Sequence, residues 1–383
     1  MSSGISSDRR HISCDLHLHS RFSIASSPRM TPHAMAGAAL RKGLGAIGTG
    51  DALHPQWRRE WEEFLSGSET AGVIVVPSAE VEDRDRVHHL ILMDDFFGFF
   101  ELQKTFSLAG REIAATGRPR VRLSGEEIAR GVHDAGGLVG PAHAFTPWTS
   151  MYASHDRVAE CYGSEPIDFL ELGLSADSSY GAAIPDLYGV PFLSSSDAHC
   201  PDPWRMGREC VVLEVGEATP AGVLEAVSGG RILRNIGLYP EEGKYNRTAC
   251  SRCFLQFSID EAAAHAWKCP GDGGRIKKGV LDRARELSLG EPRSRPPYLH
   301  MIPLTEILQR VLGCSSPQAR RVELLYSRFV GRFGNEIRVL TEVPVQDIAT
   351  VHEGAASAIA ALRCGRVKLS PGGGGRYGTF SFL

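Results

Sequence analysis

Two histidines lie two residues apart in a short apolar run near the start of the chain, "CDLHLHSRFS" (residues 14–23). Side chains alternate between the two faces of a strand, so a strand here would point His17 and His19 to the same side. A second pair with this spacing, Asp197 and His199, occurs in "SSSDAHC". Imidazole nitrogens and carboxylate oxygens are the usual protein ligands of zinc, manganese and similar divalent ions. The two pairs therefore predict a metal site.

Residues of the same chemistry end other apolar runs. Asp51 closes "LGAIGTGD", Glu80 follows "GVIVVPSA", and His143 closes "GGLVGPAH". His88 and His89 would point to opposite faces of a strand, so only one can join this set, and we favour His88. A lone histidine is more often a hydrogen-bonded structural residue, but the set as a whole suits a cluster of divalent ions in which Glu80 bridges two of them. Such clusters activate water and neutralise charge on a phosphoryl group, so the set predicts phosphoester hydrolysis.

The elements that must position these residues alternate along residues 12–235. Ser124 and Glu127 have the spacing of a helix capping box. Expected strands cover 44–51, 72–81, 87–93, 136–143, 167–173, 190–199 and 209–215, and expected helices cover 32–43, 57–67, 124–136 and 219–230. This alternation predicts an α/β fold with a parallel sheet, most simply a closed β/α barrel whose carboxyl strand ends build the site.

The composition changes after residue 235. Residues 236–280 contain Cys250, Cys253 and Cys269, whose spacing is typical of a zinc knuckle, although a degenerate knuckle held only by its core is the alternative. Residues 281–383 are arginine-rich with helical periodicity. We therefore divide the chain into a tail (1–11), a catalytic unit (12–235), a zinc-binding insert (236–280) and a helical, basic DNA-binding region (281–383).

Charge and cysteine content narrow the function classes. Residues 230–383 carry 23 Lys and Arg against 14 Asp and Glu, whereas residues 1–229 carry 19 against 31. This asymmetry suits a cation site beside a polyanion-binding surface, although chance in an arginine-rich chain could produce it. No apolar run is long enough for a membrane span, and the polar tail resembles disordered chain rather than a signal peptide. Nine cysteines without an export signal predict reduced thiols and a cytoplasmic protein.

The motif order resembles a known superfamily. H-x-H near the start, a later Glu, two further His and the closing "SDAH" resemble the polymerase and histidinol phosphatase (PHP) superfamily of metal-dependent phosphoesterases. "GTGDALHPQW", "SDAHCPDPWRMGRE", "CSRC" and "SPGGGGRYG" further resemble endonuclease Q and its relatives over essentially the whole length. The resemblance implies a distorted, seven-stranded β/α barrel with a zinc-ribbon-like insert and a helical C-terminal domain. It also implies cleavage of DNA on the 5′ side of deaminated bases (uracil, hypoxanthine or xanthine) or of abasic sites.

The resemblance also assigns site residues. It implies two or three divalent ions, which could be Zn, Mn or Mg. The first would be held by His17, His19, Glu80 and Asp197, the second by Glu80, His88 and His143, and the third by Asp51 and His199. Glu80, Asp197 and His199 are the catalytic candidates. A structural zinc ion would be held by Cys250, Cys253, Cys269 and Asp272, the last standing where relatives have a cysteine.

A base inside a duplex cannot reach the mouth of a barrel, so such an enzyme needs a flipped base or a single strand. Trp148 and Tyr152 are candidates for stacking on that base. The remaining DNA-contact candidates are Ser175 and Asp177 for base edges, and Arg275, Lys277 and Lys278 for phosphates. Each cation alone is more often a solvated surface charge. The rival hypotheses are a small-molecule phosphoesterase of histidinol-phosphatase type and a nucleic-acid-binding module that no longer cleaves; protein partners are unknown.

Overall fold

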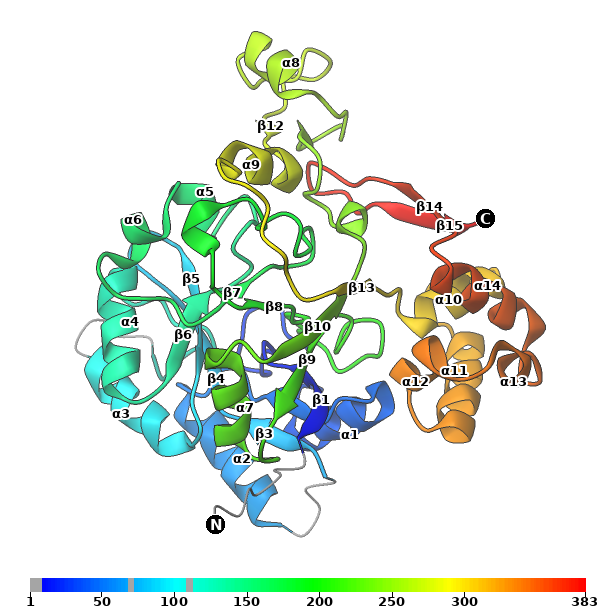
Figure 1. Cartoon of the computed structure of the whole chain (residues 1–383), viewed down its shortest axis with the longest axis horizontal. Helices are drawn as coiled ribbons and strands as arrows, with labels where there is room; N and C mark the ends of the chain where they lie inside the picture. Colours follow the sequence, from blue (N-terminus) through cyan, green and yellow to red (C-terminus); the bar gives the residue numbers. More distant parts are fainter. Residues whose placement is uncertain (1–8, 68–71, 108–112) are drawn as a thin grey trace, which may run out of the picture.

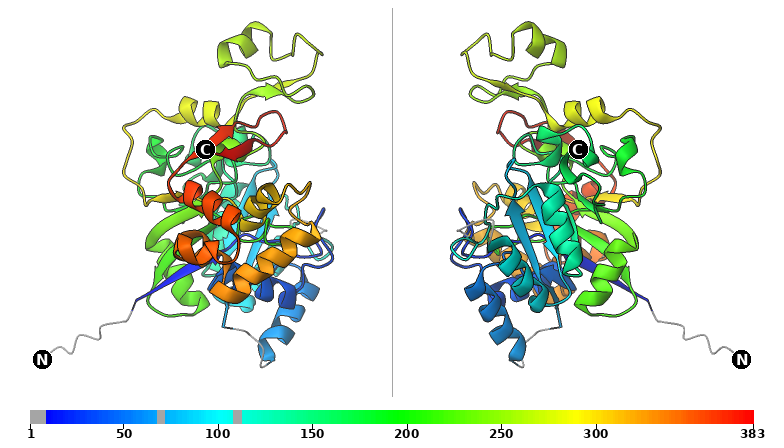
Figure 2. Two further views of the ribbon diagram at one scale, coloured as in Figure 1. Left: turned by 90° about the vertical axis from the view of Figure 1, so that its right-hand side faces the viewer. Right: turned by 90° about the vertical axis from the view of Figure 1, so that its left-hand side faces the viewer.

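The computed structural model describes residues 9–67, 72–107 and 113–383. An α/β body carries the insert at one end and the C-terminal helices at one side (Figures 1 and 2). The expected tail 1–11 lies mostly outside the described residues, but Arg10 and His11 already belong to the first strand. Over the part of the chain that is described, no helix has both the length and the hydropathy needed to cross a membrane. All nine cysteines are free thiols.

The largest sheet has six strands. In spatial order these are β13 (Tyr298–His300), β10 (Ile232–Gly237), β9 (Cys210–Val215), β1 (Arg10–Asp15), β2 (Ala46–Gly48) and β3 (Ile74–Val76). β1, β2 and β3 run parallel, as expected, whereas β9 runs antiparallel to both β1 and β10. The C-terminal part of the chain therefore supplies an edge strand, β13, to the body.

Two smaller sheets complete the body. The first contains β4 (Ser78–Glu82), β5 (His88–Leu92) and β6 (Leu138–Pro141), and the second contains β7 (Leu170–Glu171) and β8 (Phe192–Leu193). β5 runs antiparallel to both neighbours, because the five residues between β4 and β5 are too few for a crossover. The expected all-parallel arrangement is therefore wrong, and the strand pairing of the described residues does not form one closed sheet.

Helices cover the outside of the body. They are α1 (Pro32–Lys42), α2 (Pro55–Ser66), α3 (Phe96–Ser107), α4 (Gly125–Asp134), α5 (Met151–Ser154), α6 (Val158–Tyr162), the 3-10 turns η1 (Pro185–Leu187) and η2 (Pro240–Glu242), and α7 (Pro220–Ser228). The capping box predicted at Ser124 and Glu127 is present at the start of α4. Helix α3 was not predicted.

The insert projects from the body (Figure 1). It contains β11 (Ala249–Cys250), α8 (Ile259–Ala264) and β12 (Ile276–Lys277). Its core consists of only Cys250, Ala262, Cys269 and Ile276, with Phe257 and Trp267 partly buried against them. A core this small does not hold a fold without a metal ion or another cross-link. The next helix, α9 (Val280–Leu287), packs its buried side chains into the core of the body.

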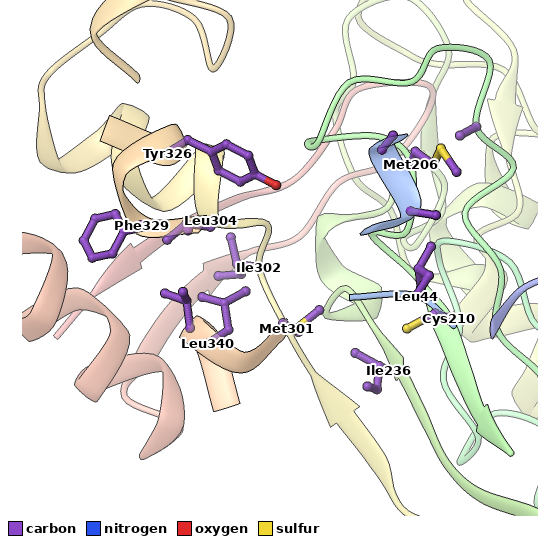
Figure 3. Packing of buried hydrophobic residues seen from close by; sticks show 14 of the residues in the cluster. Leu44, Met206, Cys210, Ile236, Met301, Ile302, Leu304, Tyr326, Phe329 and Leu340 are labelled. Carbon is purple, nitrogen blue, oxygen red and sulfur yellow. The ribbon is translucent and has the colours of Figure 1, made fainter. Parts of the chain in front are cut away.

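The C-terminal helices share a hydrophobic core with the body. They are α10 (Leu304–Val311), α11 (Arg320–Phe333), α12 (Glu336–Thr341), α13 (Val345–Ala349) and α14 (Glu353–Arg363), followed by the hairpin β14 (Val367–Ser370) and β15 (Thr379–Phe382). Leu44, Met206 and Cys210 of the body belong to the same buried cluster as Ile302 and Leu340 (Figure 3). The hairpin was not predicted within this region.

Candidate active site

A single buried carboxylate, Glu80 of β4, lies at the centre of the candidate site. Its Oε1 is 2.7 Å from Nδ1 of His88 and 2.9 Å from Nε2 of His143. Its Oε2 is 3.4 Å from Nε2 of His19 and 3.2 Å from Nη1 of Arg118. Burial alone would raise the pKa of Glu80, but these histidines hold it well below its usual value. Glu80 is therefore an anion that lies between two groups of imidazoles, His17 and His19 on one side and His88 and His143 on the other.

The two histidines of the first motif lie just beyond β1, and carboxylates behind them fix their rings. Nδ1 of His17 donates to Glu171, 2.9 Å from Oε2, and Nδ1 of His19 lies 3.1 Å from Oδ1 of Asp51. Their Nε2 atoms are buried, face Glu80 and have no hydrogen-bond partner among the residues that the structure describes. A carboxylate behind the imidazole with a free nitrogen in front is the arrangement of histidine ligands in metal sites.

Asp197 closes the first group from the end of β8. Its Oδ1 is 3.0 Å from Nε2 of His19 and 3.7 Å from Nε2 of His17. Asp197 (φ +50°), His143 (φ +31°) and Asp51 (φ +52°) all have left-handed backbone, which is uncommon for residues other than glycine. Backbone strain of this kind gathers where side chains are held for function.

Two groups of side chains could therefore hold divalent ions. Ligand atoms of His17, His19 and Asp197 lie within 4.8 Å of one another, and so do those of Glu80, His88 and His143. The carboxylates around them make the site strongly attractive to cations. Burial alone would lower the pKa of His17, but Glu171, Asp197 and Glu80 raise it to about 9.

The structure distinguishes His88 from His89 and bears on the expected site at Asp51 and His199. His88 faces Glu80, whereas His89 points away and contacts Tyr162 and Asp83. The expected third ion site is a different case, because no group of ligand atoms among the described residues joins Asp51 to His199. Both oxygens of Asp51 are occupied, Oδ1 by His19 and Oδ2 by Ser20 and Ser23 (residues 20 and 23 of the first motif). Asp51 therefore lies behind His19 and orients its ring, while the ring of His199 lies tilted against that of His19, with centroids 4.3 Å apart.

A cavity of about 760 Å³ opens over the cluster. Its lining combines three residues of the candidate metal site (His88, His143 and Asp197) with the cations Arg86, Arg118, Arg205, Arg208 and Lys244 and the aromatic residues Trp148, Trp204, Tyr245 and Tyr377. Cations around a carboxylate-rich floor suit a phosphodiester that must approach bound metal ions. The cavity is far wider than a metal site alone requires.

The expected base-contact residues are divided by this cavity. Trp148 and Ser175 line it. Tyr152 does not, because it is only 1% exposed and stacks on Phe145 in the core. Asp177 is not part of the lining either, since one of its oxygens accepts from Ser179 and the other lies 3.1 Å from Nε2 of His300. Neither Tyr152 nor Asp177 therefore lines the cavity over the metal-site cluster.

The three expected phosphate contacts lie beside the cavity on the insert. Arg275 is exposed, and Lys277 and Lys278 are half-buried. Nζ of Lys277 lies 3.9 Å from the ring centroid of Trp148, so the insert and the cavity wall meet at this cation–aromatic contact. All three cations line a second hollow of about 570 Å³ between the insert and the body.

The cysteine residues of the insert form a separate group with Asp272. One ligand atom from each of Cys250, Cys253, Cys269 and Asp272 lies within 4.8 Å of the others. Sγ of Cys253 and Sγ of Cys269 are 3.6 Å apart, and Sγ of Cys250 is 3.3 Å from Oδ1 of Asp272. A sulfur–sulfur distance of this size, without a bond, suits ligands gathered around one tetrahedral ion.

Solved structures show the same architecture. The crystal structure of the lesion-specific endonuclease PfuEndoQ from Pyrococcus furiosus aligns with a TM-score of 0.92 and 43% identity, covering 97% of this chain and 96% of that chain. The chain belongs to the endonuclease Q family. A structure of endonuclease Q with a 27-mer duplex carrying an abasic lesion at its active site aligns with a TM-score of 0.93 and 43% identity, covering 98% of this chain and 97% of that one.

Relatives of this endonuclease Q family member also include longer proteins. The uncharacterized protein MJ0043 of Methanocaldococcus jannaschii is 43% identical over 248 residues, which are 63% of this chain. The match spans 31% of the length of that protein. The family model described as the MJ0043 C-terminal domain matches residues 303–366, which correspond to helices α10 to α14.

Four functional side chains of this family member were missed from the sequence. Glu171 ends β7 and receives Nδ1 of His17 and the backbone N–H of His143. Its place in the expected strand "IDFLELG" was the available signal, since other site residues also end strands. Arg118 and Arg208 carried no such signal. The fourth, Asp15, is buried and accepts from the backbone N–H of both Ser196 and Gly207, so one carboxylate holds both ends of the loop 197–206.

Proposed function

We propose that the protein is a metal-dependent DNA endonuclease that cleaves the phosphodiester on the 5′ side of a deaminated base or an abasic site. The observation that carries this proposal is Glu80, whose two oxygens face two groups of metal-ligating side chains on the floor of a cation-lined cavity. The family supports the substrate, because the related endonuclease Q binds a duplex with an abasic lesion at its active site.

Two divalent ions would be held by the residues of the two groups. His17, His19 and Asp197 would hold one, His88 and His143 the other, and Glu80 would bridge them. Zinc, manganese and magnesium all fit this mixed nitrogen and oxygen set. When bound, the ions lower the pKa of water and offset charge on the phosphate. His199, beside His19 at the rim, is a candidate for contacts to substrate rather than a ligand of a third ion with Asp51.

The remaining side chains would handle the DNA. Arg118, which lies next to Glu80, and Arg208 would donate hydrogen bonds to the non-bridging oxygens of the scissile phosphate. The cavity is deep and wide enough for an extruded nucleotide, with Trp148 as a stacking surface and Ser175 as a polar contact. Lys277, Lys278 and Arg275 would contact flanking phosphates from the insert, and the basic C-terminal helices would extend that surface.

The finer features of the fold belong to the same proposal. Backbone hydrogen bonds connect the sheets at two places. The N–H of Asp168, just before β7, donates to the carbonyl of Val139 in β6, and the N–H of His19, after β1, donates to the carbonyl of Ala198, after β8. We regard the ring they complete as a distorted barrel of the PHP type. The cysteine group would hold one structural zinc ion, and nine reduced thiols suit a cytoplasmic protein.

The test is incubation with end-labelled duplexes that contain one uracil, hypoxanthine, xanthine or abasic site, across a panel of divalent ions. We expect nicking 5′ of the lesion and none of the unmodified duplex. His17→Ala and Asp197→Ala should abolish nicking while DNA binding persists. His133→Ala is the matched control, because His133 lies on α4 and pairs with Glu165 and Asp168 away from the cavity. Hydrolysis of histidinol phosphate without any nicking of DNA would overturn the proposal in favour of the small-molecule phosphoesterase.

A further inference from the structure

Two large apolar side chains, Phe254 and Leu255, project from the turn that follows β11 in the cysteine-rich insert. The turn that follows β11 is closed by backbone hydrogen bonds from Phe254 to Cys250 and from Cys250 to Leu255. Phe254 is 36% exposed and Leu255 is 54% exposed. Neither contributes to the small core of the insert, which is built on Cys250, Ala262, Cys269 and Ile276. The turn therefore presents its apolar side chains to the outside.

The backbone at Phe254 makes this arrangement unfavourable for folding alone. Its φ of +63° lies in the left-handed region, which glycine adopts freely and a bulky residue does not. A phenylalanine at this position therefore costs conformational energy, and its ring does not offset that cost by joining the core of the insert. A strained backbone that holds an exposed aromatic residue in place points to a role of that residue in recognition.

Tyr377 links the turn to the active-site cavity. Phe254 lines a small hollow of about 160 Å³ together with Gln256, Arg376 and Tyr377. Tyr377 also lines the large cavity above the metal-ligating side chains. The amide of Gln256 donates to the carbonyl of Pro371, at 2.7 Å, which ties the turn to the loop that carries Tyr377. The apolar pair is thus continuous with the proposed DNA site.

Cations surround the apolar pair. Arg252 in the turn and Arg376 in the facing loop are both exposed. An apolar tip between arginines complements nucleic acid, in which flat apolar bases are stacked between rows of phosphates. A protein surface would offer no such regular alternation. Because extruding a nucleotide breaks its stacking on both neighbours, enzymes that bend or open DNA insert apolar side chains between bases.

We propose that Phe254 and Leu255 form a wedge that enters the base stack beside the nucleotide that the cavity receives. This inference rests on the proposed function and adds the step that opens the duplex. The wedge occupies the space left by the extruded nucleotide, while Arg252 and Arg376 contact the neighbouring phosphates. Its contribution is needed when the lesion lies in a paired helix and is dispensable when the lesion is already unstacked.

The decisive variant is Phe254→Gly, because glycine removes the ring and relieves the left-handed backbone. Its unfolding midpoint should be unchanged or higher, which separates the proposed role from a structural one. Leu255→Ser removes the second side chain, and Leu324→Ala is the matched control. Leu324 is an exposed leucine, 57% accessible, on α11 in the C-terminal helices.

Each variant is assayed on one abasic strand in two forms, fully paired and with the lesion in an unpaired loop. For Phe254→Gly we expect kcat/KM on the paired duplex to fall about tenfold to hundredfold, as for loss of one aromatic stacking contact, and to fall by less than about threefold on the unpaired form. Leu324→Ala should match the wild type on both. Equal losses on both forms, or no loss on either, would overturn the wedge.

A second readout does not depend on cleavage. A 2-aminopurine placed next to the lesion brightens when its stacking is broken, so the wild type should raise its fluorescence on binding and Phe254→Gly should not. Equal brightening by both proteins refutes the wedge and leaves Phe254 as a contact for a protein partner. A wild type that binds and brightens the duplex without nicking any lesion retains the wedge and refutes the proposed function.

Discussion

A buried ion pair joins the body to the C-terminal helices, and breaking it should destabilise the protein strongly. Lys42 at the end of α1 is 1% exposed, and Glu336 at the start of α12 is fully buried. Nζ of Lys42 lies 2.9 Å from Oε1 of Glu336 and donates to the carbonyl of Pro203 at 2.5 Å. The same Oε1 also accepts from the backbone N–H of Leu304, at the start of α10.

The perturbation is Lys42→Met, which keeps the length of the side chain and removes the charge. Glu336 then remains as a buried carboxylate without its cation, and the carbonyl of Pro203 loses its donor. Removing one partner of a buried pair typically costs about 3–5 kcal/mol in the free energy of unfolding. Urea unfolding followed by tryptophan fluorescence measures that loss. A nicking assay of the same variant shows whether activity falls in parallel.

The double variant Lys42→Met with Glu336→Gln tests the reason for the loss. Glutamine is neutral and retains a carbonyl for the N–H of Leu304, so we expect it to recover about 2 kcal/mol or more of the stability. Arg29→Ala is the control, since the pair between Arg29 and Asp202 is exposed and should contribute less than about 1 kcal/mol. A single variant within 1 kcal/mol of the wild type, or a double variant no more stable than the single, would refute the reasoning.

Three further outcomes follow from the structure. Glu171→Gln leaves His17 without its carboxylate, and we expect about tenfold to hundredfold weaker activating-metal affinity, measured by nicking against ion concentration; unchanged affinity would contradict this role. Burial raises the pKa of Glu209 from 4.5 to about 8. The unfolded chain therefore releases this proton at lower pH than the folded protein, so stability falls with rising pH across that window by about 1.4 kcal/mol per unit. Glu209→Gln should flatten that fall in urea unfolding at pH 5 and pH 8, and an equal slope in both proteins would exclude Glu209 as its source. Asp272→Cys should tighten zinc binding at the insert in competition with a chromophoric chelator, whereas weaker binding would place the fourth ligand elsewhere.

The metal-ligating side chains could be predicted because each follows from a local pattern. His17 and His19 share a side by spacing alone, and Asp197 ends an apolar run. The structure brings His17, His19 and Asp197 together, with both imidazoles facing Glu80. His88 joins them for a reason that the sequence pattern did not show. β5 runs antiparallel, so its first residue lies at the same end of the sheet as the last residue of β4.

The residues that the structure places differently from the sequence prediction are ones whose surroundings depend on contacts far apart in sequence. Asp51 has the chemistry of a ligand, but its oxygens are already taken by residues 19–23. Tyr152 has the chemistry of a stacking residue, but its ring is buried against Phe145. Asp177 is paired with His300, which lies 123 positions away. No periodicity in one sequence reports such pairings. The direction of β5 was likewise missed, because this strand is buried on both faces and its continuous apolar run reads like a strand of a parallel sheet.

One buried carboxylate, Asp15, suspends the loop 197–206 by both of its ends. The residues that anchor this loop, Ser196 and Gly207, are therefore distinct from the residues between them. Trp204 and Arg205 lie inside the loop and line the cavity, while Asp197 directly follows the anchored residue Ser196. Substitutions inside the loop, at positions such as 204 and 205, would therefore change the lining of the cavity without displacing Asp197.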